Sequence, residues 1–168
     1  MSKRTAAKPP FTFQYTFDAP KHLVFDAFGN AEALNEWWGP VESRNSVVKL
    51  DFRPGGIFHF SMQAKDGSMS YGRMLFKTIQ PHDLLEFSNA FADENANVVK
   101  APFDIPLPLE IHYKIIFTEV KGKTTIHMTG EADGSEAEVA GFTSIFAGME
   151  MGFGASFKQL SKYLAKKN

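Results

Sequence analysis

The histidines are the first residues to consider for metal or acid–base chemistry. His59, His112 and His127 lie in segments that alternate apolar and polar residues, and each takes a polar position that we expect to face solvent. A metal site needs convergent ligands with a supporting second shell, but the chain has no HxH or HExxH spacing and no cysteine. We therefore expect solvated histidines, no metal and no cofactor.

The carboxylates also lack the pairing that an acid–base site requires. Asp51, Asp66 and Asp83 lie at expected turns, where aspartate caps local backbone amides, and the acids between 131 and 138 precede or begin the last helix. No Ser-His-Asp set occurs with a nucleophile elbow, and "RPGG" at 53–56 lacks the lysine and the helix of a phosphate loop. Catalytic residues stay unassigned, and a non-enzymatic protein is the favoured interpretation.

A second group of polar side chains is expected to point into the apolar interior. The group comprises Tyr71 or its neighbour Arg73, Asn89, Tyr113 and Glu150. Glu150 lies between two methionines on the last helix, and it is either a solvated helix residue or a polar anchor inside a cavity. In a cavity, its pKa would be raised and it would need a partner.

Two adjacent tryptophans, Trp37 and Trp38, are followed at once by Gly39 and Pro40. Burying one indole is worth about 2–3 kcal/mol, so both rings must pack against something apolar. We expect one ring to belong to the core and the other to form a wall or lid of a space between sheet and helix.

The apolar pattern predicts the elements that position these residues. Period-two segments predict strands at 11–17, 46–52, 57–64, 69–80, 84–92, 109–120 and 124–132. Hairpin-length links between most of them favour an antiparallel meander, interrupted by a long irregular loop over 93–106. Two short helices are expected between the first two strands, at 18–28 and 31–38.

The C-terminal segment has a helical period instead. Apolar residues recur at intervals of three and four over 135–167, which predicts one long amphipathic helix with an irregular entry or kink near Gly148. A curved sheet must bury one face, and this helix alone is long enough to cover it. The predicted fold class is therefore α+β, with a curved seven-stranded antiparallel sheet wrapped around the C-terminal helix.

Composition limits the classes of partner. The 168 residues carry a net charge of −1, which argues against a nucleic-acid partner, and no apolar run is long enough to span a membrane. We expect a flexible arm at 1–10, a single domain at 11–168, and a soluble cytoplasmic protein that is a monomer or a homodimer. Seventeen phenylalanines and seven methionines indicate a broad interior with adaptable walls.

Several motifs come in an order that points to a family. They are "WWGP" at 37–40, "RPGG" at 53–56, "PHDLLEF" at 81–87 and "GMEMGFGASFKQLSKYL" at 148–164. From Phe11 to Leu164 the chain resembles the homologues of the activator of the heat-shock-protein-90 ATPase, within the START-like superfamily (SRPBCC) that includes the birch-pollen allergen. The resemblance implies a helix-grip fold with an apolar cavity, and a link to chaperones and the stress response. Superfamily relatives bind lipids or aromatic natural products, and some cyclise polyketides.

Three hypotheses for function follow. The first is a binding protein that holds a small apolar or amphipathic ligand; the second is a protein-interaction module acting through the exposed sheet face; the third is a cyclase- or dehydratase-like enzyme. Aromatic side chains that fill the whole interior would remove the first. Its expected ligand-binding residues are Trp37, Trp38, Phe58, Phe60, Met62, Tyr71, Met74, Phe87, Asn89, Tyr113, Met149, Glu150, Phe153 and Phe157.

Overall fold

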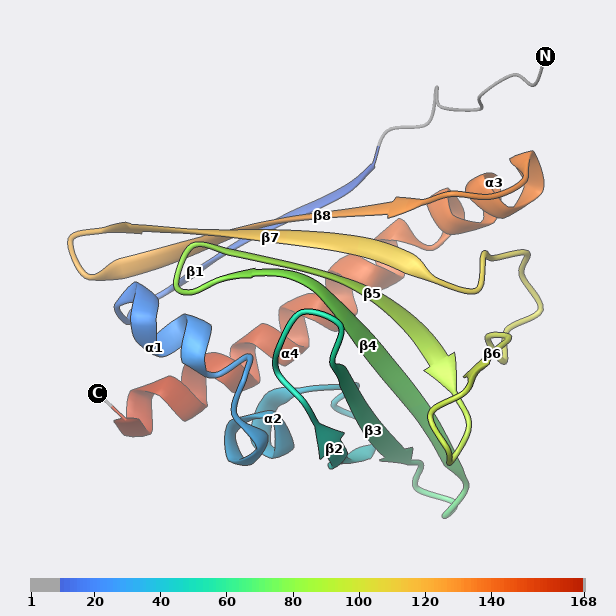
Figure 1. Ribbon diagram of the computed structural model, residues 1–168, viewed down its shortest axis with the longest axis horizontal. Coiled ribbons are helices and arrows are strands. Elements are labelled where there is room, and N and C mark those ends of the chain that lie inside the picture. Colours follow the sequence, from blue (N-terminus) through green and yellow to red (C-terminus); the bar gives the residue numbers. More distant parts are fainter. Residues whose placement is uncertain (1–9, 168) are drawn as a thin grey trace.

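A computed structural model of the chain describes residues 10–167, so the expected N-terminal arm, except for its last residue, lies outside the described residues. A curved sheet of eight strands packs against a long helix, α4, which runs across it (Figure 1). The strands are β1 (Phe11–Phe17), β2 (Arg44–Leu50), β3 (Ile57–Gln63), β4 (Met69–Gln80), β5 (Leu84–Ala92), β6 (Val98–Val99), β7 (Ile111–Val120) and β8 (Lys123–Ala132). The helices are α1 (Lys21–Asp26), α2 (Ala31–Trp37), α3 (Glu136–Ser144) and α4 (Phe146–Lys167).

The sheet confirms the predicted helix-grip architecture. Its order is β1-β8-β7-β5-β4-β3-β2, and every pair is antiparallel. The seven long strands are the seven predicted ones, and β6 adds a two-residue eighth that pairs with β5. This short strand lies inside the segment expected to be an irregular loop, because two residues are too few to give a period-two pattern.

The irregularity expected near Gly148 is a break at Ile145, three residues earlier, which separates α3 from α4. Helix α3 begins with a capping box, in which the Ser135 hydroxyl accepts from the Glu138 amide at 3.1 Å. At its other end the Ser144 hydroxyl donates to the carbonyl of Gly141 at 2.6 Å, a local bond that competes with continuation of the helix. Gly141 also lies directly against the carbonyl of Pro106, with no room for a side chain, which fixes α3 against the long loop.

Aromatic rings fill the space under the C-terminal half of α4. Phe157 is fully buried there and lies 5.8 Å from the Trp37 ring, whose Nε1 donates to the carbonyl of Ala27 at 2.9 Å. Phe28 packs edge-on against Trp37 at 4.8 Å and against Phe117 at 5.5 Å. The buried residues of α4 begin only at Ser156, so the first half of the helix lies over a different environment.

Candidate ligand-binding site

A cavity of about 680 Å³ lies where the first half of α4 passes over the sheet. Its floor comes from β3, β4, β5 and β7, its roof from α3 and α4, and its side from residues 101–109 and 38–42. Its residues are largely apolar, and they include Trp38, Phe60, Met62, Gly72, Asn89, Phe103, Leu107, Ile111, Tyr113, Phe142, Ile145, Gly148, Met149, Gly152 and Phe153. The volume falls within the usual range of small-molecule sites, roughly 300–1,000 Å³.

Two glycines in the strands keep the floor of the cavity low. Gly72 is the cross-strand partner of Phe60, and Gly130 is the cross-strand partner of Tyr113. A Cβ atom on Gly130 would lie 2.7 Å from Cε1 of Tyr113, and one on Gly72 would collide with the Phe60 ring. Both rings therefore lie across the neighbouring strand instead of standing up into the space, which is a common reason for glycine inside a strand.

Two glycines of α4 keep the roof high. Gly148 and Gly152 are four residues apart, so they lie on the same face of the helix, and both line the cavity. A Cβ atom added at either position would meet no atom of the described residues within 4 Å. Glycines in both the sheet and the helix therefore leave room for the cavity between them.

Two polar side chains on the floor have no hydrogen-bond partner among the described residues. The Tyr113 side chain lines the cavity and is only 7 % exposed, and burial raises the pKa of its hydroxyl well above the ordinary value. Asn89 lies on the adjacent strand, opposite Ile111, and so is a diagonal neighbour of Tyr113 on the same face, about 7–8 Å away. The pair offers a neutral donor and acceptor set to a ligand.

The other polar groups of the lining lie nearer the helix and the rim. The Ser156 hydroxyl already donates to the carbonyl of Gly39 at 2.8 Å. The indole nitrogen of Trp38 is buried and has no hydrogen-bond partner within residues 10–167, which distinguishes this ring from Trp37. Glu42 is the one charged side chain among the described residues that line the cavity.

The rim of the cavity is apolar and reaches solvent. Four large apolar side chains that line the cavity are exposed: Val41, Phe103, Leu109 and Met151, the last at 77 %. An enclosed apolar void of this size would cost about 24 cal/mol per Å³, more than the total stability of most domains. Because water or a ligand can enter, the cavity does not carry that cost.

Comparison with known proteins identifies the family of the chain. The family model described as activator of Hsp90 ATPase homolog 1-like protein matches residues 18–165. The chain belongs to this family. The comparison with curated protein sequences gave no match.

Solved structures of similar proteins share the fold over nearly the whole family domain. A solution structure from Staphylococcus epidermidis is 28% identical and covers 99% of this chain and 94% of its own, with a TM-score of 0.77. A solution structure from Arthrobacter aurescens is 25% identical, and the match covers 98% of this chain and 90% of the other, with a TM-score of 0.78. A crystal structure from Mycobacterium smegmatis is also 25% identical, and the match covers 96% of this chain and 94% of the other, with a TM-score of 0.75. Within residues 10–167, no helix is long and apolar enough to cross a membrane.

In this family member, half of the predicted ligand-binding residues line the cavity. They are Trp38, Phe60, Met62, Asn89, Tyr113, Met149 and Phe153. Five others, Trp37, Phe58, Met74, Phe87 and Phe157, are buried in the core and do not line it. They belong to the buried hydrophobic core, where neighbouring side chains cover them.

The remaining two candidates lie elsewhere. Glu150 is exposed and does not line the cavity, so it is the solvated helix residue of the two alternatives. Tyr71 pairs with Ser61, which puts it on the outer face of the sheet, and Arg73, two residues further along β4, lies on the same outer face. Gly72, between them, faces inward, so neither Tyr71 nor Arg73 reaches the cavity.

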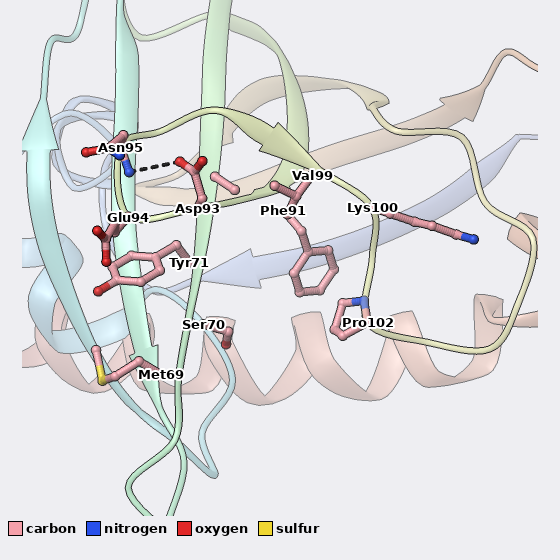
Figure 2. Close-up of a pocket in the computed structure, with 11 residues that line it drawn as sticks. Met69, Ser70, Tyr71, Phe91, Asp93, Glu94, Asn95, Val99, Lys100 and Pro102 are labelled. Atoms are coloured by element: carbon pink, nitrogen blue, oxygen red, sulfur yellow. Dashed lines mark hydrogen bonds between the residues drawn. The ribbon is translucent and has the colours of Figure 1, made fainter.

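The outer face also corrects the prediction for His59. Its side chain is only 4 % exposed, because the turn after β5 folds over it and its Nε2 hydrogen-bonds the carbonyl of Asp93 at 3.0 Å. A smaller hollow of about 480 Å³ adjoins this turn, where β4 begins and β5 ends, and Tyr71, Phe91 and Lys100 are among its residues (Figure 2). Hydrogen bonds from Asn97 hold the pKa of Asp93 below its ordinary value.

Sequence reasoning missed the glycines and the loop that shape the cavity. Gly72 and Gly130 interrupt strands, and each lies opposite an aromatic residue, a signal that depends on knowing the strand register. The loop residues Phe103 and Leu107 close one side, although their segment has no regular period. The period of the apolar residues indicates which face of a strand or helix points inward. It does not indicate whether other side chains cover that face or leave it open to a cavity.

Proposed function

We propose that this protein binds a small apolar or amphipathic molecule in the cavity between the sheet and α4, without covalent chemistry. The observation that carries the proposal is a solvent-accessible, largely apolar cavity with the unpaired Tyr113 hydroxyl and Asn89 amide on its floor. The family as a whole is consistent with a ligand-binding or interaction module.

The size and lining of the cavity favour a ligand over permanent hydration. At about 30 Å³ per molecule, the 680 Å³ could hold about 20 waters, most of them against apolar walls. Moving an apolar ligand into contact with these walls is favourable by about 25 cal/mol per Å² of surface removed from water. Met62 and Met149 add adaptable wall segments that can adjust to ligand shape.

A catalytic role has less support from the geometry. General acid–base catalysis needs a group that changes protonation near neutral pH, within hydrogen-bond reach of the reacting atom. The raised pKa of Tyr113 keeps its hydroxyl protonated, and Glu42, the one charged group among the described lining residues, lies in the exposed segment after Pro40. A holding function therefore fits the described residues better than a cyclase-like reaction.

The test combines native mass spectrometry with dye binding. We expect the purified protein either to carry a co-purified small molecule, seen as added mass, or to bind the neutral dye N-phenyl-1-naphthylamine with a rise in fluorescence. The double variant Gly148→Phe/Gly152→Phe fills the cavity from the helix and should lose both signals, whereas the control Gly154→Ala, which lies outside the lining, should keep them. Neither signal in the wild type, or equal signals in the double variant, would overturn the proposal.

A further inference from the structure

We propose that the cavity selects uncharged ligands bearing a hydroxyl or carbonyl group and discriminates against carboxylates of the same chain length. The inference rests on the proposed function and adds the chemical class of the ligand. It starts from the charges of the lining: none of the described lining residues is a lysine, arginine or histidine, and the one charged residue, Glu42, is acidic. A carboxylate bound there would have no counter-ion.

The cations of neighbouring elements are directed elsewhere. Arg73 lies on the outer face, where its Nη1 donates to the carbonyl of Ala96 at 3.1 Å and its Nη2 lies 4.0 Å from a Glu110 carboxylate oxygen. Lys100 lines the outer hollow of Figure 2, and Arg44 pairs with Gln63 on the outer side of β2. Lys158 of α4 is exposed and does not line the cavity.

The inner end of the cavity suits a neutral polar group. Tyr113 remains a protonated phenol that can donate or accept one hydrogen bond, and Asn89 brings an amide donor and acceptor. An alcohol or a carbonyl compound can satisfy both side chains while its apolar part covers Phe60, Phe153 and Met149. An ionised carboxylate accepts the same hydrogen bonds but loses its hydration without gaining a cation, and burying an unpaired charge costs far more than burying a neutral group.

The expected discrimination can be estimated from protonation. A carboxylic acid can still enter in its neutral form, but with a pKa of about 4.3 only about one molecule in 500 is neutral at pH 7. We therefore expect the acid to bind on the order of 100-fold more weakly than the alcohol at pH 7. Its affinity should rise about tenfold for each unit by which the pH falls toward 5, whereas that of the alcohol should not change.

The experiment measures displacement of N-phenyl-1-naphthylamine from the wild-type protein by dodecanol, dodecanoate and dodecylamine. We expect dodecanol to compete well and dodecanoate to compete on the order of 100-fold less well at pH 7, with the difference shrinking as the pH is lowered. Tyr113→Phe should weaken the binding of dodecanol by about 3- to 10-fold, since the variant removes one hydrogen bond. Glu42→Lys, at the rim, should strengthen the binding of dodecanoate several-fold relative to that of dodecanol.

The outcomes separate this inference from the proposed function. Dodecanoate that competes as well as dodecanol at pH 7 would overturn the charge selectivity while the cavity remained a binding site. A bound dye that none of the three compounds displaces would also overturn the selectivity. Failure of the wild type to bind the dye or any of the three compounds would overturn the proposed function itself.

Discussion

Replacing Gly152 by phenylalanine should make the protein more stable and at the same time less able to bind a ligand. Gly152 lies inside α4 and faces the cavity, and no atom of residues 10–167 would lie within 4 Å of an added Cβ atom. The helix propensity of phenylalanine is more favourable than that of glycine by about 0.5 kcal/mol. Complete burial of its ring would add about 1.5–3 kcal/mol, of which an open cavity should provide about half.

The expected gain for Gly152→Phe is therefore about 1–2 kcal/mol of unfolding free energy, or a rise in Tm of about 2–8 °C for a domain of this size. Thermal unfolding followed by circular dichroism measures the stability, and titration with N-phenyl-1-naphthylamine measures binding. Gly152→Ala is the matched control: it should gain up to about 1 kcal/mol from helix propensity alone and keep its affinity for the dye. A Gly152→Phe protein with a lower Tm and unchanged dye binding would refute the placement of the cavity under α4.

Other predictions concern the floor, the indoles and the outer turn. Tyr113→Phe should change the urea-unfolding free energy by less than about 0.5 kcal/mol, because the lost hydroxyl has no partner among the described residues; a loss above about 1.5 kcal/mol would contradict this. Gly130→Ala should cost about 1–3 kcal/mol in the same assay, because the new methyl group meets the Tyr113 ring, and an unchanged midpoint would contradict it. Ligand-induced changes in tryptophan fluorescence should disappear in Trp38→Phe, because Trp38 lines the cavity and Trp37 does not; a persisting change would contradict this. Because the pKa of Asp93 is lowered in the folded state, its carboxylate should contribute stability above the ordinary aspartate pKa of about 4, and this contribution should be lost as the pH falls through the folded value. Asp93→Asn should therefore reduce the loss of unfolding free energy at acid pH, and an unchanged acid dependence would contradict this.

The strands could be predicted from the sequence because each buries one face. Alternation in segments such as "FTFQYTF" and "IHYKIIF" fixes which residues face α4, and the observed register agrees for Phe58, Phe60 and Tyr113. The glycines of the C-terminal segment predict a kink or irregular entry near Gly148, but the position of the break at Ile145 could not be predicted. It accompanies the contact between Gly141 and the carbonyl of Pro106, which are distant in sequence.

The candidate site could be predicted only in part for a related reason. Phe157 and Phe153 are four residues apart on the same face of α4, but Phe157 lies fully buried among other rings and Phe153 borders the cavity. The difference arises from what lies opposite each residue, and that depends on the sheet curvature and on the loop around Phe103. His59 illustrates the same limit on the outer face, where a turn more than thirty residues later covers it.

The most direct test of the account is to map a ligand on the protein by amide chemical-shift changes. When N-phenyl-1-naphthylamine is titrated into ¹⁵N-labelled protein, the largest changes should fall on Asn89, Tyr113, Gly148 and Gly152, with little change at Leu160 in the ring-packed core. Changes confined to the outer hollow around Tyr71 and Lys100, or no changes at all, would contradict the claim that the space beneath α4 is a binding site.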